Sequence, residues 1–138
     1  MQKIALVTGA SRGIGAASAR RLAAAGFAVC VNYKAQQGLA EALVAELRTF
    51  GVRAIAVQAD VAVEVDVVRM FEQVYKQLGP LWVLVNNAAM LSQQMRVEQM
   101  TAARINNMLM TNVTSAFICC REAVLRMSKE RVALVAAL

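Results

Sequence analysis

Short, uninterrupted apolar runs alternate with longer amphipathic stretches along this chain. Four of the runs predict β-strands, at residues 4–7, 27–31, 54–57 and 81–85. Their apolar residues are contiguous, whereas a strand with one solvent-exposed face would alternate apolar and polar positions. Contiguous runs are typical of parallel strands that are covered on both faces.

The stretches between the runs predict helices. Residues 14–25 are rich in alanine and stop at a glycine, as do residues 36–50. In residues 63–78 the apolar positions recur every three or four residues, which is the period of an amphipathic helix. A long helix is expected from residue 98 to residue 127, with an apolar stripe formed by Ile105, Leu109, Ala116, Cys119, Ala123 and Met127.

Strands that alternate with helices form right-handed βαβ units. The chain is therefore expected to be a single α/β domain over residues 1–138, with a doubly wound, Rossmann-like parallel sheet in the strand order 3-2-1-4. In such sheets ligands bind beyond the carboxyl ends of the strands. The segments that directly follow each strand are therefore the places to look for a site.

A glycine-rich segment, Thr8–Gly15, follows the first predicted strand and leads into a helix. Gly9 permits a tight turn, Gly13 lets the backbone approach a pyrophosphate, and Gly15 lets the helix pack closely on the sheet. The first turn of the helix would then offer free N–H groups and a partial positive charge to phosphates. A plain tight turn is the alternative reading of the same glycines.

The segment after the second strand bears on the choice of cofactor. A carboxylate there would bind the ribose diol of NAD, but the sequence reads Val31-Asn32-Tyr33-Lys34. Arg12 and Lys34 are both candidates to face a 2′-phosphate, which favours NADP over NAD. Lys34 as an ordinary surface charge is the competing interpretation.

Composition narrows the classes of function. The chain has no histidine and three cysteines without a Cys-x-x-Cys pair, which argues against a Cys/His zinc site and a His-based triad. Its net charge of +6 comes from scattered lysines and arginines, so no nucleic-acid partner is expected. The uncharged stretches are short for a membrane span and the amino-terminal apolar run is short for a signal peptide, which predicts a cytoplasmic protein.

Two of these segments resemble one known family. Thr8–Gly15 is similar to the cofactor motif of short-chain dehydrogenases/reductases, and Asn86-Asn87-Ala88-Ala89 is similar to that family's Asn-Asn-Ala-Gly motif. The resemblance extends from Lys3 to about Met127 and implies an NADP-dependent oxidoreductase acting on carbonyls or alcohols. The expected cofactor-binding residues are Gly9, Ser11, Arg12, Gly13, Ile14, Gly15, Asn32, Tyr33, Asp60, Val61, Asn87 and Ala88.

The resemblance also assigns roles to single polar residues. It places Asp60-Val61 beside the adenine, although Asp60 could instead be the N-cap of the 63–78 helix. It identifies Asn112 with the family's active-site asparagine, which organises water and a backbone kink. A satisfied core amide is the alternative for Asn112, because it falls within the apolar stripe. Ala89 and Ser115 stand where the family usually has glycine.

The family's catalytic acid/base residues have no counterpart in the sequence. That chemistry uses a serine and a Tyr-x-x-x-Lys pair, in which the lysine lowers the tyrosine pKa. Here Gln37 stands four residues after Tyr33, and Gly79 four after Tyr75. We therefore expect a truncated reading frame, incomplete at its carboxyl end, that is either the binding part of an oxidoreductase or a non-catalytic remnant. Such a chain is expected to be a homo-oligomer or prone to aggregation.

Overall fold

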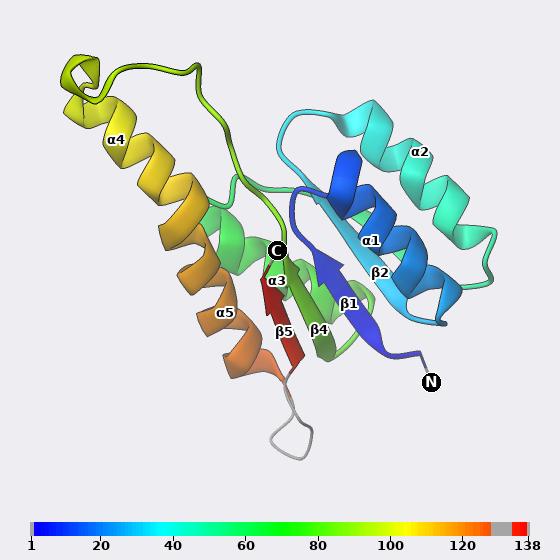
Figure 1. Ribbon diagram of the computed structural model, residues 1–138. Helices are drawn as coiled ribbons and strands as arrows, with labels where there is room; N and C mark the ends of the chain where they lie inside the picture. The colour runs from blue at the N-terminus through cyan, green and yellow to red at the C-terminus, as the bar shows by residue number, and fades with distance from the viewer. Residues whose placement is uncertain (1, 128–133, 138) are drawn as a thin grey trace.

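The computed structural model describes residues 2–127 and 134–137, which form one parallel sheet with helices on both faces (Figure 1). The predicted strands all form, and the second, third and fourth extend further than expected, to Tyr33, Gln58 and Asn86. The strands are β1 (Ile4–Val7), β2 (Ala28–Tyr33), β3 (Ala54–Gln58), β4 (Leu81–Asn86) and β5 (Leu134–Ala137).

The strand order is β3-β2-β1-β4-β5, and every neighbouring pair is parallel. The expected order of the first four strands is thus confirmed. Beyond the four strands expected from the sequence, β5 forms a fifth strand by pairing with β4 along Val83–Asn86. Val132, Ala133 and Leu138 of the carboxyl-terminal tail lie outside the described residues.

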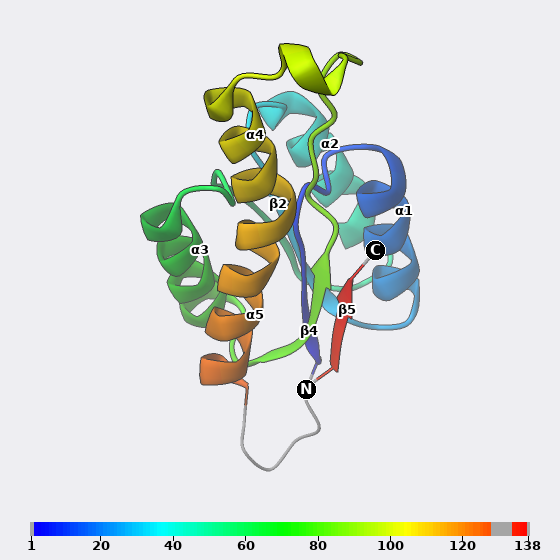
Figure 2. The ribbon, with the colours of Figure 1, turned by 60° about the vertical axis from the view of Figure 1, so that its left-hand side comes forward.

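Helices cover the sheet in two layers (Figure 2). One layer holds α1 and α2, and the other holds α3 and the α4–α5 helix. Within a turn of the predicted positions the helices are α1 (Gly13–Ala24), α2 (Gln37–Arg48) and α3 (Glu64–Gln77).

The long helix differs most from its prediction. It begins at Ala102, because the Thr101 side chain caps it by accepting a hydrogen bond from the Arg104 amide, 3.2 Å away. Glu98, the expected start, lies in a separate short 3₁₀ turn. The segments are η1 (Val97–Gln99), α4 (Ala102–Leu109), the π-helical turn η2 (Met110–Thr114) and α5 (Ser115–Arg126).

The apolar stripe of this helix is buried only in its second half. Cys119, Ala123 and Met127 pack in the core, whereas Ile105 and Leu109 are exposed because α4 extends past the edge of the sheet (Figure 1). Within the described residues, Ala102–Arg126 is the one helix long and apolar enough to cross a membrane. Core helices of soluble proteins meet the same criteria of length and composition.

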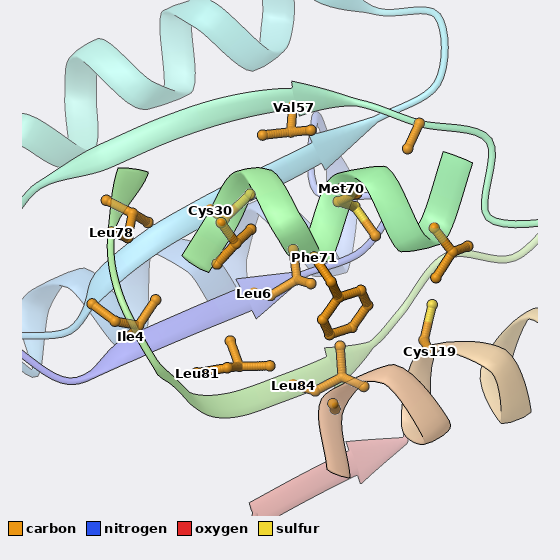
Figure 3. Close-up of a cluster of buried hydrophobic side chains, with 14 of the residues drawn as sticks. Ile4, Leu6, Cys30, Val57, Met70, Phe71, Leu78, Leu81, Leu84 and Cys119 are labelled. Carbon is orange, nitrogen blue, oxygen red and sulfur yellow. The ribbon is translucent and has the colours of Figure 1, made fainter. Parts of the chain in front are cut away.

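Two apolar cores hold the layers together, one on each face of the sheet. In the core beneath α3 and α5, the ring of Phe71 lies among Leu6 of β1, Leu84 of β4 and Cys119 of α5 (Figure 3). The β1 residues are fully buried on both faces, as the contiguous apolar runs predicted. The packed layers hold the carboxyl ends of the strands in place, and these ends support the loops that follow them.

Candidate functional site

The loops that follow β1, β2, β3 and β4 meet over the carboxyl edge of the sheet and enclose a cavity of about 510 Å³. All the predicted cofactor-binding residues except Gly15 line it. Other lining residues were not singled out for the cofactor from the sequence: Ala35, Gln36, Ala59, Ala89, Met90 and Thr111. Lys34, a candidate for the 2′-phosphate, also lines the cavity.

The β1–α1 loop forms one wall and has the backbone that its glycines predict. Gly9 and Gly13 adopt positive φ angles of 58° and 60°. A side chain at Gly13 would meet nothing within 4 Å, so its backbone is open to a ligand. Helix α1 begins at Gly13 with no side-chain cap and no acidic residue in its first turn. Its partial positive charge therefore faces the cavity uncompensated.

Gly15 is not one of the residues that line the cavity, and it packs against the motif loops. A Cβ atom at Gly15 would lie 2.4 Å from Nδ2 of Asn87 and 2.7 Å from the carbonyl oxygen of Gly9. The bare glycine is thus what lets α1 approach the loop after β4. This geometry matches the close packing that the sequence predicted for Gly15.

Thr8 connects the two motif loops, and sequence reasoning assigned it no role of its own. Its hydroxyl oxygen accepts hydrogen bonds from the amides of Asn87 and Ala88, both at 3.0 Å. The Thr8 side chain is buried, so these bonds are shielded from water. The sequence signal for this linking role was a hydroxyl-bearing residue at the end of a central strand, directly before a glycine turn.

Asn87 completes the connection from the other side. Its side-chain amide donates to the carbonyl oxygens of Thr8 at 2.9 Å and Gly9 at 3.0 Å. The neighbouring Asn86 donates to the carbonyl oxygen of Ala116 in α5, at 3.2 Å. The Asn-Asn pair thus fixes the end of β4 to the glycine loop in one direction and to α5 in the other.

Asn32 lines the cavity, but its side chain forms hydrogen bonds with the backbones of other residues. Its Oδ1 accepts from the Gly9 amide at 3.0 Å, and its Nδ2 donates to the carbonyl oxygens of Val57 and Ala59, both at 3.2 Å. It is only 1% exposed. Asn32 therefore braces the glycine loop against the end of β3, and satisfied bonding explains why the polar side chain tolerates burial.

Lys34 and Asp60 meet at the rim of the cavity, where Lys34 Nζ lies 3.3 Å from Asp60 Oδ2. Asp60 is not the N-cap of α3, because that position belongs to Val63. Its Oδ1 instead accepts from the Ala62 amide at 3.0 Å and closes a turn before the helix. Val61, next to Asp60, is buried against the core.

Asn112 lies in the π-helical turn and does not line the cavity itself. Its amide group pairs with the backbone of Met90, accepting from the amide at 2.7 Å and donating to the carbonyl oxygen at 2.9 Å. Met90 and Thr111 do line the cavity. Asn112 therefore holds the loop after β4 against the long helix. Single π-helical turns within α-helices are frequent at functional sites.

The cysteines stand apart from the site. Burial raises the pKa of the Cys30 thiol well above its usual range, and burial together with Cys120 and Glu122 raises the pKa of Cys119 to about 12. Both thiols are thus protonated packing groups. Among residues 2–127 and 134–137, no cluster of His, Cys, Asp or Glu side chains could hold a metal ion.

The chain was compared with known families and curated proteins. The model of the short chain dehydrogenase family matches residues 3–137. The oxidoreductase YgfF of Escherichia coli is 49% identical over 125 residues, covering 91% of this chain and 51% of the relative. The 3-oxoacyl-[acyl-carrier-protein] reductase FabG of Staphylococcus aureus is 40% identical over 131 residues, covering 95% and 53%. The chain thus spans about half the length of these relatives.

Solved structures of short-chain dehydrogenases and related proteins share the fold of this chain. A short chain dehydrogenase from Burkholderia cenocepacia in complex with NADP superposes with a TM-score of 0.91 at 37% identity, over 98% of this chain and 54% of that one. A blue fluorescent protein from a metagenomic library, in complex with NADPH, superposes with a TM-score of 0.90 at 38% identity and the same coverage. Family match, identity and fold agree: the chain belongs to the short-chain dehydrogenase/reductase family.

Proposed function

We propose that this chain binds NADP in the cavity above the carboxyl ends of the strands, as the cofactor-binding part of a carbonyl or alcohol oxidoreductase. One observation carries the proposal: the uncapped start of α1 and the cations Arg12 and Lys34 converge on one cavity. A dinucleotide phosphate needs N–H groups, a helix dipole and positive side chains together.

Different groups of lining residues would contact different parts of the dinucleotide. The backbone amides of Gly13 and Ile14, at the start of α1, would hold the pyrophosphate, and Asp60 and Val61 would lie beside the adenine. Asn87, Ala88 and Met90 would border the nicotinamide, which supplies or accepts a hydride when bound. Asn112 would act through Met90 by fixing the nicotinamide end of the cavity.

NADP is favoured over NAD because no carboxylate directly follows β2, where NAD-binding sheets place one. Arg12 is exposed on the wall of the cavity and free to form a fork of hydrogen bonds with a 2′-phosphate. Two of the superposed structures are complexes with NADP or NADPH, which supports the same choice.

Hydride transfer by the 138-residue chain alone is not part of the proposal. Tyr33 is buried at the end of β2, and Tyr75 lies on the exposed surface of α3, outside the cavity lining. Neither has a lysine four residues later. A positioned acid/base typically contributes 10²–10⁴-fold to a rate, so we propose nucleotide binding without turnover. A purely associating role, through the exposed apolar side chains of α5, is the second candidate.

Calorimetric titration of the purified chain with NADP and with NAD tests the proposal. We expect tighter binding of NADP, and the Arg12→Ala variant should lose roughly tenfold in NADP affinity with little change for NAD. Arg21→Ala is the matched control, because Arg21 is an exposed arginine in the last turn of α1. Equal losses for both nucleotides would refute the role of Arg12, and NADPH oxidation above background with a panel of ketones would refute binding without turnover.

A further inference from the structure

A second pocket, of about 590 Å³, lies between α4 and the segment that joins β4 to this helix. That segment leaves the sheet beside α4 and turns back into the helix through η1 (Figures 1 and 2). None of the residues that line this α4 pocket lines the cofactor cavity. Long, unbranched side chains dominate its wall, among them Gln93, Met95, Arg96, Met100, Arg104 and Met108.

Arg104 connects the two sides of the α4 pocket. Its guanidinium donates to the carbonyl oxygen of Gln93 on the loop side, and its amide donates to the capping side chain of Thr101 at 3.2 Å. The η1 turn is closed by the Met100 amide, which donates to the carbonyl oxygen of Val97 at 3.1 Å. The frame of the pocket is therefore held in place by the chain itself, without a ligand.

The charges at the α4 pocket are positive and incompletely matched. Nε of Arg104 is buried and has no hydrogen-bond partner among the described residues. Of the described residues that line the pocket, none is acidic. A buried donor on a charged group is unfavourable without an acceptor, and an oxygen atom of a ligand would supply one.

The rest of the wall is apolar and adaptable. Met100, Arg104 and Met108 follow one another at intervals of four residues, so they share one face at the start of α4. Met95 lines the pocket from the loop. Unbranched thioether side chains fit ligands of different shape because all their bonds rotate. The pocket thus combines a guanidinium group with a flexible apolar lining.

We propose that the α4 pocket binds an aliphatic carboxylate, with the carboxylate group at Arg104 and the hydrocarbon chain against the methionines. The planar guanidinium matches a carboxylate in geometry. Arg96, whose side chain is 81% exposed, lies 3.6 Å from Glu98, so its charge is partly offset and a monoanion suits the site better than a phosphate dianion. The volume falls within the range of small-molecule sites, roughly 300–1,000 Å³.

Octanoate, below its micelle concentration, is the probe for the site. Calorimetric titration of the full chain should show saturable binding, and backbone amide NMR signals should change most in residues 93–96 and 100–108. Acetate lacks the chain and 1-octanol lacks the charge, so each should bind at least about tenfold more weakly than octanoate. The affinity for octanoate should be unchanged when NADP is present, because the two pockets share no residue.

A pair of variants at Met108 tests the role of charge without removing the hydrogen bonds of Arg104. Met108→Glu places a carboxylate in the wall of the pocket, and Met108→Gln places a neutral side chain of the same shape there. Met108→Glu should bind octanoate about tenfold more weakly than Met108→Gln, because like charges repel in a partly shielded pocket. Circular dichroism would establish that both variants fold.

The proposal would be overturned if octanoate did not bind saturably, or if 1-octanol bound as tightly. Equal affinities of the two Met108 variants would also contradict it. Signal changes centred on Phe117 and Val124, on the exposed face of α5, would identify general apolar adsorption in place of a site. Displacement of octanoate by NADP would place the probe in the cofactor cavity and overturn the proposal, while the proposed function would stand.

Discussion

The residues that build the cavity hold one another before they hold any ligand. Thr8, Asn32 and Asn87 each form two or more side-chain hydrogen bonds with the backbones of neighbouring segments. Each such bond contributes about 0.5–1.5 kcal/mol net, and an unmatched buried partner costs about 1–3 kcal/mol. The wall of the cavity is therefore preorganised, which lowers the ordering cost of binding.

Gly15 offers the sharpest test of this close packing. A methyl group there would enter the space of Asn87 Nδ2 and of the Gly9 carbonyl, so Gly15→Ala should destabilise the chain by about 1–3 kcal/mol despite the better helix propensity of alanine. It should also weaken NADP binding. Urea unfolding and calorimetry measure the two effects.

Gly38 provides the matched control for Gly15. It also lies in the first turn of a helix, α2, but a Cβ atom there meets nothing within 4 Å. Gly38→Ala should therefore stabilise the chain by about 0.4–1 kcal/mol. A Gly15→Ala variant that is as stable as Gly38→Ala would contradict the close approach of α1 to the loop after β4.

At the scale of elements, strands and helices were predictable where burial alone decides them. Contiguous apolar runs identified β1 to β4, and glycines marked the carboxyl ends of α1, α2 and α3. The start of the long helix was not predictable in this way, because Thr101 provides the cap and the chain before it turns in a 3₁₀ segment. The π-turn has no periodic signal, since it depends on the pairing of Asn112 with a distant backbone.

The functional site was likewise only partly predictable from the sequence. Glycines, and polar residues that directly follow strands, could be found from the sequence because the fold brings strand ends together. The bracing role of Asn32 and the linking role of Thr8 could not, because they depend on which neighbouring loop lies within hydrogen-bond distance. The ion pair of Lys34 with Asp60 likewise depends on the register of β2 with β3.

Helices α3 and α5 are joined by a buried carboxylate and two arginines. Glu122 on α5 is bonded by Arg121 and Arg126, and Arg121 also lies 3.6 Å from Glu64 on α3. The guanidinium of Arg126 lies over the ring of Phe71, 5.8 Å from its centre. Burial alone would raise the pKa of Glu122, but the hydrogen bonds from Arg126 and Arg121 outweigh it and hold the pKa below its usual value.

A lowered pKa in the folded state makes the contribution of Glu122 dependent on pH. The stabilisation is fully present above the unfolded-state pKa of about 4.3 and is lost as the pH falls through the lowered folded-state pKa. Glu122→Gln should therefore cost about 1–3 kcal/mol at pH 7 and progressively less below about pH 4. Urea unfolding over this pH range measures the cost, and Glu72→Gln, at an exposed position on α3, is the control. A cost that does not depend on pH would contradict the ion-pair account.

For the whole molecule, the exposed face of the long helix is the most conspicuous surface. Leu109, Val113, Phe117 and Val124 recur at helical spacing and are 46–74% exposed. Strand β5 pairs with β4 along Val83–Asn86, so β4 is not the edge strand of the sheet. Association should therefore proceed through the helix and not through β4.

We predict that the chain is a dimer or larger at tens of micromolar. Phe117→Glu combined with Val124→Lys should shift it towards the monomer, because charges on a contact face are costly to bury. Light scattering coupled to size-exclusion chromatography measures the mass. Val65→Lys, at an exposed position on α3, is the control. A sharp wild-type monomer peak would refute the prediction.

The central claim is that a nicotinamide dinucleotide binds above the carboxyl ends of the strands. The most direct measurement is the change in backbone amide NMR signals of the ¹⁵N-labelled chain during titration with NADP. The account predicts that the largest changes cluster in four segments that line the cavity, namely Ser11–Ile14, Asn32–Gln36, Ala59–Val61 and Asn87–Met90. Changes centred elsewhere, or no saturable change at millimolar NADP, would contradict it.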